Sequence, residues 1–448
     1  MSIQTKINIP EVGVPRLVIV GGGFAGISLA RRAARMNCQV VLIDRNNYHQ
    51  FQPLFYQVAM SGLEPSSISF PFRKLFQGRK NVYIRVTEVT AIKPEQQRIE
   101  TPLGYCNYDH LVLCTGTDTN FYGNEELERL ALPMKSVSEA LYLRNTILDD
   151  YEKAVVTTDY ENRQGLIDVV IVGGGPTGVE LAGSLSEMKH KILPKDYPEL
   201  AVEQEMDIYL IQSGDVLLKG MSKEASEKSL EYLREMGVNV LLNKRVKTYD
   251  GTYAYLDDDS KLRTDKLIWA AGVKGVIIPG LAPETITRGN RFKVDRYNRV
   301  QGLGNVYAIG DIAYLEEPDY PEGHPQVAQV AIQMGDHLAA NFRRSFNGDN
   351  WREFSYRDKG SMATVGRARA VVDLPNGWSF GGLLAWLTWL LVHLFAILGT
   401  RNKLFVFVNW LINYINYNQS LRLIIRPRNP APDMERYMNS LGRARQEG

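Results

Sequence analysis

Residues 16–26 read RLVIVGGGFAG, an apolar run of strand length that ends in a cluster of glycines. Residues 28–36 have the composition of a helix, and a second apolar run from 39 to 43 ends at Asp44. Strand, glycine turn, helix and strand in this order predict a βαβ unit.

The three glycines of the turn have separate tasks in such a unit. Gly21 permits the tight turn, Gly23 lets a pyrophosphate approach the backbone, and Gly26 lets helix and strand pack closely. The N-terminus of the following helix supplies free N–H groups and a positive dipole end. Asp44 is placed to bond ribose hydroxyls. The turn therefore predicts a dinucleotide site, to which Phe24 and Ala25 also belong.

The same pattern returns in residues 168–180, which read DVVIVGGGPTGVE. A helix is expected from 179 to about 190, then a helical stretch around 191–205, and a strand over 208–211. Two such motifs in one chain are far more specific than one, and they predict an internal duplication of a nucleotide-binding unit. The candidate ligand residues of the second turn are Gly173, Gly175, Pro176, Thr177 and Gly178.

Gln212 stands where a carboxylate is expected at the end of the second strand. A carboxylate there binds the ribose and repels the additional phosphate of NADPH, whereas a neutral amide bonds the hydroxyls but repels less. The second site is thus expected to take a nicotinamide dinucleotide, and Gln212 leaves the use of NADPH open.

A third signal is NVYAIGD over residues 305–311. A short strand that ends in Gly310-Asp311 can place a carboxylate and a helix N-terminus beside the ribityl chain of a flavin, although it can also be a plain buried strand with a turn. Two further strands end in small residues that we add to the candidate cofactor-binding set: Thr115 and Gly116, and Ala271 and Gly272.

Composition excludes several other classes. The net charge of +2 and the lack of a basic stripe argue against a nucleic-acid binder. Three cysteines without a CxxC pair indicate a reducing compartment and neither a zinc site nor a redox dithiol. The first 16 residues suit neither a signal nor a transit peptide, so we expect a location on the cytosolic side.

The C-terminal part is apolar in two segments, 381–399 and 404–425. The first approaches the length of a membrane span, but His393 interrupts it, and tryptophans favour the interface. The second alternates Asn409, Asn413, Asn416 and Asn418 with apolar residues, as amphipathic surface helices do. Residues 374–432 contain no Asp or Glu, and such a basic segment favours binding to anionic lipid. Its basic residues include Arg401, Lys403, Arg422, Arg426 and Arg428. A dimer or core interface is the alternative.

With these motifs, the chain resembles the type II, non-proton-pumping NADH:quinone oxidoreductases, a family of two-dinucleotide flavoproteins. The resemblance also rests on residues 47–54 (NYHQFQPL), 269–273 (WAAGV), 328–333 (AQVAIQ) and 359–363 (KGSMA). It implies that the first glycine turn and the Gly-Asp segment bind FAD and that the second turn binds NADH. It extends the FAD-site candidates to Arg45, Gln52 and Ala328.

The resemblance assigns four residues to catalysis. Gln329 and Gln333, with Lys359 nearby, would lie at the quinone site, although two glutamines spaced i and i+4 can also be a polar pair on one helix face. Glu180 would lie where nicotinamide meets flavin, or it only stabilises the helix dipole. No metal is expected.

The expected fold is α/β, with two Rossmann-like domains of the glutathione-reductase-like kind and a C-terminal membrane-associating helical region. We expect an FAD-binding domain in two segments (1–130 and 290–346), an NAD(P)H-binding domain (131–289) and a membrane-anchoring domain (347–448).

The expected activity is electron transfer from NADH through FAD to a membrane quinone, by a homodimer lying monotopically on the cytoplasmic face of the cell membrane. No cysteine lies in 45–63 or after Cys114, which disfavours disulfide and sulfide:quinone reductases. A reductase for a soluble protein acceptor, and a nicotinamide-responsive membrane scaffold of low turnover, remain alternatives.

Overall fold

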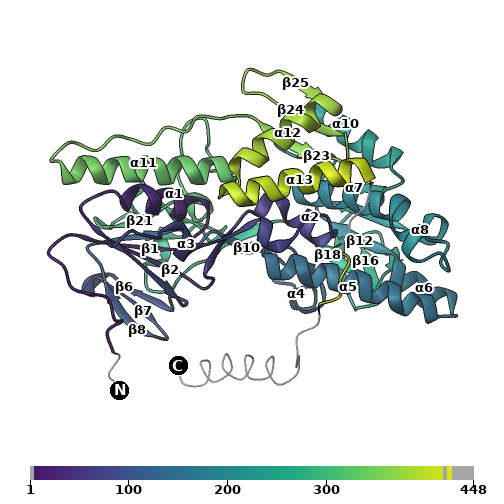
Figure 1. The fold of residues 1–448 in the computed structure, drawn as a ribbon, viewed down its shortest axis with the longest axis horizontal. Coiled ribbons are helices and arrows are strands. Elements are labelled where there is room, and N and C mark those ends of the chain that lie inside the picture. Colours follow the sequence, from purple (N-terminus) through teal and green to yellow (C-terminus); the bar gives the residue numbers. More distant parts are fainter. Residues whose placement is uncertain (1–4, 417–420, 426–448) are drawn as a thin grey trace.

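The computed structural model describes residues 5–416 and 421–425 (Figure 1). Its first layer is a five-stranded parallel sheet in the order β5-β2-β1-β9-β21. The strands are nearly continuous runs of buried apolar residues, as expected for parallel strands covered on both faces. Their bounds are β1 (Arg16–Val20), β2 (Gln39–Asp44), β5 (Val82–Val86), β9 (His110–Leu113) and β21 (Val306–Ala308).

Two helices pack together against this sheet, α1 (Phe24–Ala33) and α11 (Ala328–Phe346). They approach closely because Gly335 of α11 has no side chain: a Cβ there would lie 2.5 Å from the Ala25 carbonyl oxygen. The last strand, β21, and α11 come from far along the chain, so the first nucleotide-binding unit is completed by a second segment. The antiparallel strands β6 (Ala91–Lys93), β7 (Arg98–Thr101) and β8 (Gly104–Asn107) are inserted between β5 and β9.

A second five-stranded parallel sheet, in the order β14-β13-β12-β18-β11, repeats the arrangement. The helices of this unit include α5, α7 and α10, and a second antiparallel insertion, β15-β16-β17, lies between β14 and β18. The bounds are β11 (Leu132–Pro133), α5 (Val137–Val156), α6 (Tyr160–Ile167), β12 (Val169–Val172), α7 (Pro176–Lys191), β13 (Ile208–Gln212), α10 (Lys223–Glu235), β14 (Asn239–Leu242), β15 (Val246–Tyr249), β16 (Tyr253–Leu256), β17 (Lys261–Arg263) and β18 (Leu267–Trp269).

The two units are joined by an antiparallel pair of short strands, β10 (Thr117–Thr119) and β19 (Val273–Gly275). The stretch 191–205 forms two short helices, α8 (Leu193–Asp196) and α9 (Val202–Glu205). The remaining short elements include α2 (Phe55–Ala59), α3 (Phe72–Leu75), α4 (Glu125–Leu130), β3 (Tyr48–Gln50), β4 (Ser69–Pro71), β20 (Phe292–Lys293) and β22 (Ala313–Tyr314).

A buried ion pair ties α5 to the second sheet. The Lys266 ammonium, just before β18, is completely buried and lies 3.2 Å from a carboxylate oxygen of Asp150 on α5, whose side chain is 7% exposed. An isolated charge buried in this way costs several kcal/mol, so Lys266 depends on Asp150, which also pairs with Lys153 at 3.0 Å.

The C-terminal region is a three-stranded antiparallel sheet followed by two helices. Its elements are β23 (Ser361–Thr364), β24 (Ala370–Asp373), β25 (Ser379–Gly381), α12 (Leu383–Ala396) and α13 (Thr400–Asn416). Figure 1 shows α12 and α13 over α2 and α7, beside the end of α11. None of the helices in the part of the chain that the structure describes combines the length and the hydropathy of a membrane span. Asn418, Arg426, Arg428 and the end of the predicted C-terminal domain lie outside the described residues.

Candidate active site

The first glycine turn has the geometry that its residues predict. Gly21 has a φ of +104°, and a Cβ there would lie 2.2 Å from the Cys114 carbonyl oxygen at the end of β9. A Cβ on Gly26 would lie 1.9 Å from the Gly21 carbonyl oxygen, so only glycine lets α1 begin this close to the turn. Gly23, in contrast, faces open space with no atom within 4 Å. The backbone is therefore bare where a pyrophosphate has to approach.

Asp44 closes the turn from the next strand. One carboxylate oxygen accepts a hydrogen bond from the Gly22 N–H at 2.7 Å, and the other accepts one from the Asn46 N–H at 2.7 Å. Burial raises the pKa of Asp44, and these two N–H donors act in the opposite direction. The carboxylate is thus held at the edge of the turn, where ribose hydroxyls are expected.

These residues border a cavity of about 490 Å³ that runs from the glycine turn to Asp311. A bare glycine backbone at a helix N-terminus and two half-buried carboxylates, Asp44 and Asp311, in the wall of one cavity fit a dinucleotide such as FAD. Two predicted residues, Gly26 and Ala328, do not line the cavity. In place of Ala328, the cavity is bordered by Ala331, about one helical turn further along α11. The predicted residues that line it are Gly21, Gly23, Phe24, Ala25, Asp44, Arg45, Gln52, Thr115, Gly116, Gly310 and Asp311.

The far end of the cavity contains a lysine that was not anticipated from the sequence. The Lys135 ammonium donates to the Thr117 hydroxyl at 3.1 Å, and this hydroxyl donates to an Asp311 carboxylate oxygen at 3.4 Å. Burial raises the pKa of Asp311, while the charges of Lys135 and Arg291 lower it. Lys135 precedes α5 without any motif around it, so no sequence signal marks it.

The second glycine turn reproduces the first. Gly173 has a φ of +115°, and a Cβ on Gly178 would lie 1.9 Å from the Gly173 carbonyl oxygen, the same distance as in the first turn. Gly175 again faces open space. The Gln212 side-chain oxygen accepts from the Gly174 N–H at 3.0 Å, which is the bond that Asp44 makes to Gly22. Gln212 is therefore the structural counterpart of Asp44, with an amide in place of a carboxylate.

The other predicted residues of the second site surround this turn. Pro176 is the first residue of α7 and Thr177 the second, at the helix end that carries free N–H groups. Ala271 and Gly272 follow β18, and Gly272 has a φ of +95°. The Tyr122 hydroxyl lies where a Cβ on Gly272 would be, so this tyrosine covers the glycine.

Glu180, on the second turn of α7, is buried beneath the C-terminal sheet. One of its carboxylate oxygens accepts from the Thr364 N–H at 3.5 Å. Burial raises the pKa of Glu180 to about 8, although this N–H lowers it. The sheet sits directly on α7, because a Cβ on Gly183 would lie 2.6 Å from the Gly366 nitrogen. Glu180 thus has a defined tertiary environment and is not simply a solvated acid near a helix end.

Gln329 and Gln333 hold the segment that precedes β23. The Gln329 amide donates to the Gly360 carbonyl at 3.1 Å, and its oxygen accepts from the Lys359 N–H at 3.0 Å. Gln333 makes the same pair of bonds with the backbone of Arg357, at 2.9 and 3.0 Å. The two glutamines share one face of α11, as their spacing predicts, while the Lys359 side chain is exposed. Neither glutamine nor Lys359 lines the cavity at the first turn.

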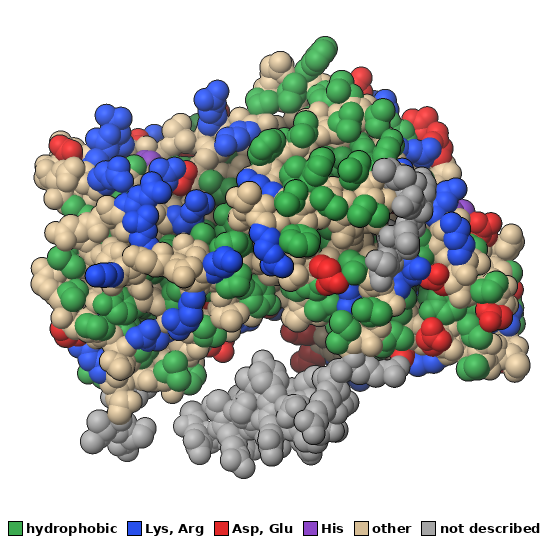
Figure 2. Space-filling model, in the orientation of Figure 1, with side chains coloured by type: hydrophobic (Ala, Val, Ile, Leu, Met, Phe, Trp, Pro, Cys, Tyr) green, Lys and Arg blue, Asp and Glu red, His purple; other side chains and the backbone are tan. Residues whose placement is uncertain are grey.

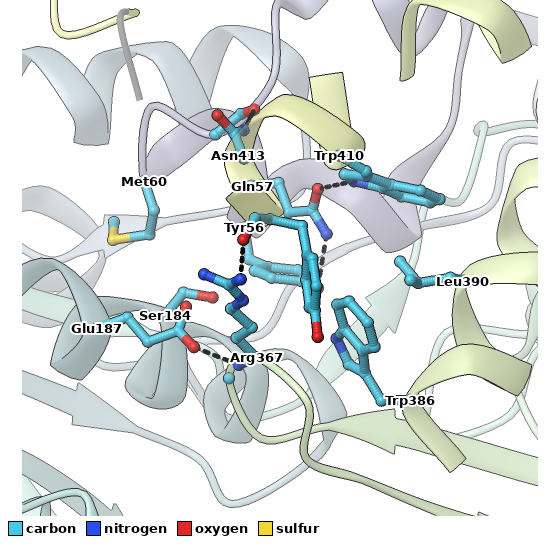
Figure 3. Close-up of a pocket in the computed structure, with 13 residues that line it drawn as sticks. Tyr56, Gln57, Met60, Ser184, Glu187, Arg367, Trp386, Leu390, Trp410 and Asn413 are labelled. Carbon is cyan, nitrogen blue, oxygen red and sulfur yellow. Dashed lines mark hydrogen bonds between the residues drawn. The ribbon is translucent and has the colours of Figure 1, made fainter. Parts of the chain in front are cut away.

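A smaller cavity of about 120 Å³ lies between α7, α2 and the two C-terminal helices (Figure 3). Its wall combines apolar and aromatic side chains with buried polar groups. It is lined by Tyr56, Gln57, Met60, Gly62, Ser184, Glu187, Gly366, Arg367, Trp386, Leu390, Trp410, Asn413 and Tyr414.

The outer faces of α12 and α13 carry a large apolar patch, which Figure 2 shows with Lys and Arg side chains beside it. Trp389 and Val406 are buried on the inner faces, so the patch does not arise from poor packing. An apolar area of this extent marks a binding surface. Its exposed residues include Leu383, Leu384, Leu387, Leu391, Val392 and Phe395 on α12, and Leu404, Phe405, Phe407, Val408, Leu411 and Ile412 on α13.

Two duplicated nucleotide units, one with a cavity suited to FAD, define a flavoprotein of the two-dinucleotide class. The family model described as pyridine nucleotide-disulphide oxidoreductase matches residues 15–335, and the NDH2 C-terminal domain matches 359–416. The chain belongs to the type II NADH:quinone oxidoreductases of this family. The resemblance and the fold class predicted from the sequence are confirmed.

Individual relatives agree with this assignment. The type II NADH:quinone oxidoreductases Ndh and NdhA of Mycobacterium tuberculosis are 31% and 32% identical to the chain, each over 90% of it and 88% of the relative. The structure of NDH2 from Plasmodium falciparum in complex with NADH superposes with a TM-score of 0.82 at 22% identity, covering 92% of this chain and all of the other. This structural match shows the shared fold.

Proposed function

We propose that the protein transfers two electrons from NADH through FAD to a membrane quinone, without pumping protons. The observation that carries this proposal is the position of Glu180, which joins the helix of the second nucleotide turn to the sheet that supports the apolar helices. The second nucleotide unit is therefore in direct contact with the C-terminal sheet on which α12 packs. FAD, when bound, supplies the redox centre between the two substrates.

The residues of the two turns perform the binding. The N–H groups at the start of α1 receive the FAD pyrophosphate beside Gly23, and Asp44 bonds its ribose. The Asp311 carboxylate, with Lys135 and Thr117, orients the ribityl end of the cofactor. In the second unit Gly175 and Gln212 take the corresponding parts of NADH, and the amide of Gln212 leaves NADPH as a slower substrate.

Glu180 acts where nicotinamide and flavin meet, and the segment bound by Gln329 and Gln333 acts at the quinone. Glu180 keeps its proton at neutral pH because burial raises its pKa to about 8, so it can donate a hydrogen bond where nicotinamide and flavin meet. Gln329 and Gln333 position the backbone around Lys359 next to the first turn of α11. In this proposal the quinone binds there, with Lys359 at its rim.

The apolar face of α12 and α13 attaches the enzyme to the membrane as a peripheral protein. Arg401 and Lys403 lie between the two apolar stretches, where each contributes about 1 kcal/mol toward an anionic leaflet. We propose that the enzyme lies on the cytoplasmic face as a homodimer. Its FAD-binding domain consists of two segments, 1–130 and 290–346, which enclose the NAD(P)H-binding domain. The membrane-anchoring domain begins near residue 347.

Anaerobic oxidation of NADH with a short-chain quinone tests the proposal. Rapid quinone-dependent turnover supports it. Reduction of the flavin by NADH without reoxidation by quinone refutes it, and turnover with a soluble electron-transfer protein would then identify the acceptor.

Vesicle flotation tests the membrane surface. Leu391→Asp should release the protein from anionic vesicles, whereas Leu103→Asp, at a residue of similar exposure (54% against 56%) on the β7–β8 turn, should not. Equal binding of both variants would show that α12 does not contact lipid.

A further inference from the structure

The duplicated units can be compared at the loop that follows β5 in the first unit and β14 in the second. In the first unit this loop contains Thr87 and Glu88, and both residues line the cavity suited to FAD. The loop is fixed beside Asp44, because the Thr87 N–H donates to the Asp44 carbonyl at 2.9 Å. The edge strand of the sheet thus contributes directly to the wall of a dinucleotide site.

The second unit repeats this bond with other residues. The Lys244 N–H donates to the Gln212 carbonyl at 3.1 Å, so Lys244 occupies the place of Thr87. The next residue, Arg245, then stands where the first unit has Glu88. An acidic residue in the wall of the FAD cavity is therefore replaced by an arginine in the nicotinamide unit.

The burial of the two loops supports this correspondence. In each loop a half-buried residue is followed by an exposed residue and then by a buried valine, which is Val89 in the first unit and Val246 in the second. The second loop has one additional residue, Asn243, in a left-handed conformation with a φ of +55°. The Asn243 N–H donates to the Gly214 carbonyl at 3.0 Å, which joins this loop to the one that follows Gln212.

The Gln212 side chain presents a hydrogen-bond donor at this junction. Its oxygen accepts from the Gly174 N–H at 3.0 Å, and its nitrogen would lie 3.1 Å from a Cβ on Gly214. In the first unit the corresponding atom is the second carboxylate oxygen of Asp44, which accepts from the Asn46 N–H. The two units therefore present opposite groups at the same point, an acceptor in the first and a donor in the second.

The charges around the second loop leave one cation available. Asp258 forms an ion pair with Lys244, and Asp259 pairs with Lys247 at 2.8 Å. The Arg245 side chain is exposed, and it forms no ion pair with any residue in the part of the chain that the structure describes. A guanidinium group and an amide donor thus occupy the place where the first unit has two carboxylates.

A phosphate ester is the ligand group that these donors fit. NADPH differs from NADH by one phosphate on the ribose that Gln212 is expected to bind. A phosphate monoester carries about −1.5 to −2 charge at pH 7, and arginine recognises it through two parallel N–H bonds. Carboxylates at the same place would repel it.

We propose that Arg245, together with the Gln212 amide and Lys244, forms a subsite for the 2′-phosphate of NADPH. This inference rests on the proposed function, in which the second unit binds the nicotinamide dinucleotide. NADPH is then a substrate, although a slower one than NADH, because Gln212 removes a repulsion and Arg245 adds an attraction. Lys244 reaches the phosphate only by leaving Asp258, so Arg245 makes the larger contribution.

Arg245→Gln tests the subsite, because it removes the charge and keeps a polar side chain. Anaerobic stopped flow measures the second-order rate constant of flavin reduction by each dinucleotide. The NADPH:NADH ratio of these constants should fall by about tenfold or more in Arg245→Gln. Arg245→Lys should keep part of the ratio, since it retains the charge without the planar geometry. Arg245→Glu, which copies Glu88, should lower the ratio further.

Arg234→Gln is the matched control, because it removes the same charge from the same unit. Arg234 is exposed near the end of α10, which precedes β14, and therefore lies at the edge of the sheet opposite to the nucleotide turns. Its ratio should stay native. Raising the salt concentration shortens the Debye length from about 30 Å at ~0.01 M to about 8 Å at ~0.15 M. This change should lower the ratio more in the native protein than in Arg245→Gln.

Calorimetry with adenosine 2′,5′-bisphosphate and with AMP tests the subsite without turnover. The native protein should bind the bisphosphate about tenfold more tightly than AMP, and Arg245→Gln should lose most of this difference. A native NADPH:NADH ratio in Arg245→Gln would overturn the inference, as would equal binding of the two nucleotides by the native protein. Preference for the bisphosphate in a native protein that does not reduce quinone would instead refute the proposed function and leave the subsite in place.

Discussion

The substitution Gly178→Ala should impair the second nucleotide site and leave the first intact. The substitution places a Cβ 1.9 Å from the Gly173 carbonyl oxygen, whereas real Cβ atoms essentially never come within 3.0 Å of another atom. The start of α7 must therefore move from the turn by about 1 Å. Because the oxygen belongs to the backbone, no side-chain rotation relieves the contact.

A displacement of ~1 Å in reacting geometry costs about 100-fold in rate, which corresponds to ~2.7 kcal/mol. We expect kcat/KM for NADH to fall by about that factor in Gly178→Ala. The first turn lies in the other sheet, so the FAD content should stay at one per chain.

The visible spectrum of the purified variant measures its FAD content, and NADH titration of flavin reduction measures the second site. Gly26→Ala is the mirror experiment, because its Cβ would also lie 1.9 Å from a carbonyl oxygen, that of Gly21, and it should lose FAD. Gly304→Ala, with no atom within 4 Å, is the control. A native kcat/KM for NADH in Gly178→Ala, or loss of FAD from it, would refute the reasoning.

Three further predictions follow from single contacts. Gln212→Glu should lower the NADPH:NADH ratio of kcat/KM by roughly tenfold, since like charges ~5 Å apart repel by ~1–3 kcal/mol at an effective dielectric of ~20–80; an unchanged ratio would remove Gln212 from the ribose site. Asp150→Ala should destabilise the protein by about 3–5 kcal/mol in denaturant unfolding because it leaves Lys266 buried and unpaired. Burial raises the pKa of Asp168 to about 7, so the folded state holds its proton more tightly than the unfolded state. The free energy of unfolding of the native protein therefore falls as pH rises from about 4 to about 7. The Tm of Asp168→Asn should rise relative to that of the native protein across this range, and the difference should persist at higher pH.

The glycine turns could be predicted because their chemistry is local. A positive φ at Gly21 and Gly173 and the close contact of each third glycine with the first are set within six residues of chain. The spacing to the end of the next strand likewise located Asp44 and Gln212, which the structure places in equivalent positions.

The buried environment of Glu180 could not be predicted, because its hydrogen-bond partner Thr364 lies 184 residues away in the sequence. Lys135 and Glu187 have the same character: each takes its environment from elements distant in the sequence, and no spacing rule brings them together. For Gln329 and Gln333 the helical spacing predicted a shared face but not the backbone segment that covers it.

The C-terminal apolar run shows how glycine limits a hydropathy argument. Residues 381–399 approach the length of a span, but α12 covers only Leu383–Ala396. Gly382 has a φ of +76° and Ile397 is extended, with a φ of −62° and a ψ of +141°; a continuing helix adopts neither conformation. Composition predicted an apolar surface correctly, while the length of the helix was decided by two backbone conformations.

The duplicated units differ most in what covers their first helix. On α1 the covering element is α11, seated through Gly335 against the Ala25 carbonyl; on α7 it is the C-terminal sheet, seated through Gly183 against Gly366. The same device, a glycine that lets backbones meet, thus joins the flavin unit to the helix bearing Gln329 and the nicotinamide unit to the apolar helices. Because α12 rests on the sheet that covers Glu180, displacement of this helix should alter the nicotinamide end of the site before the flavin end.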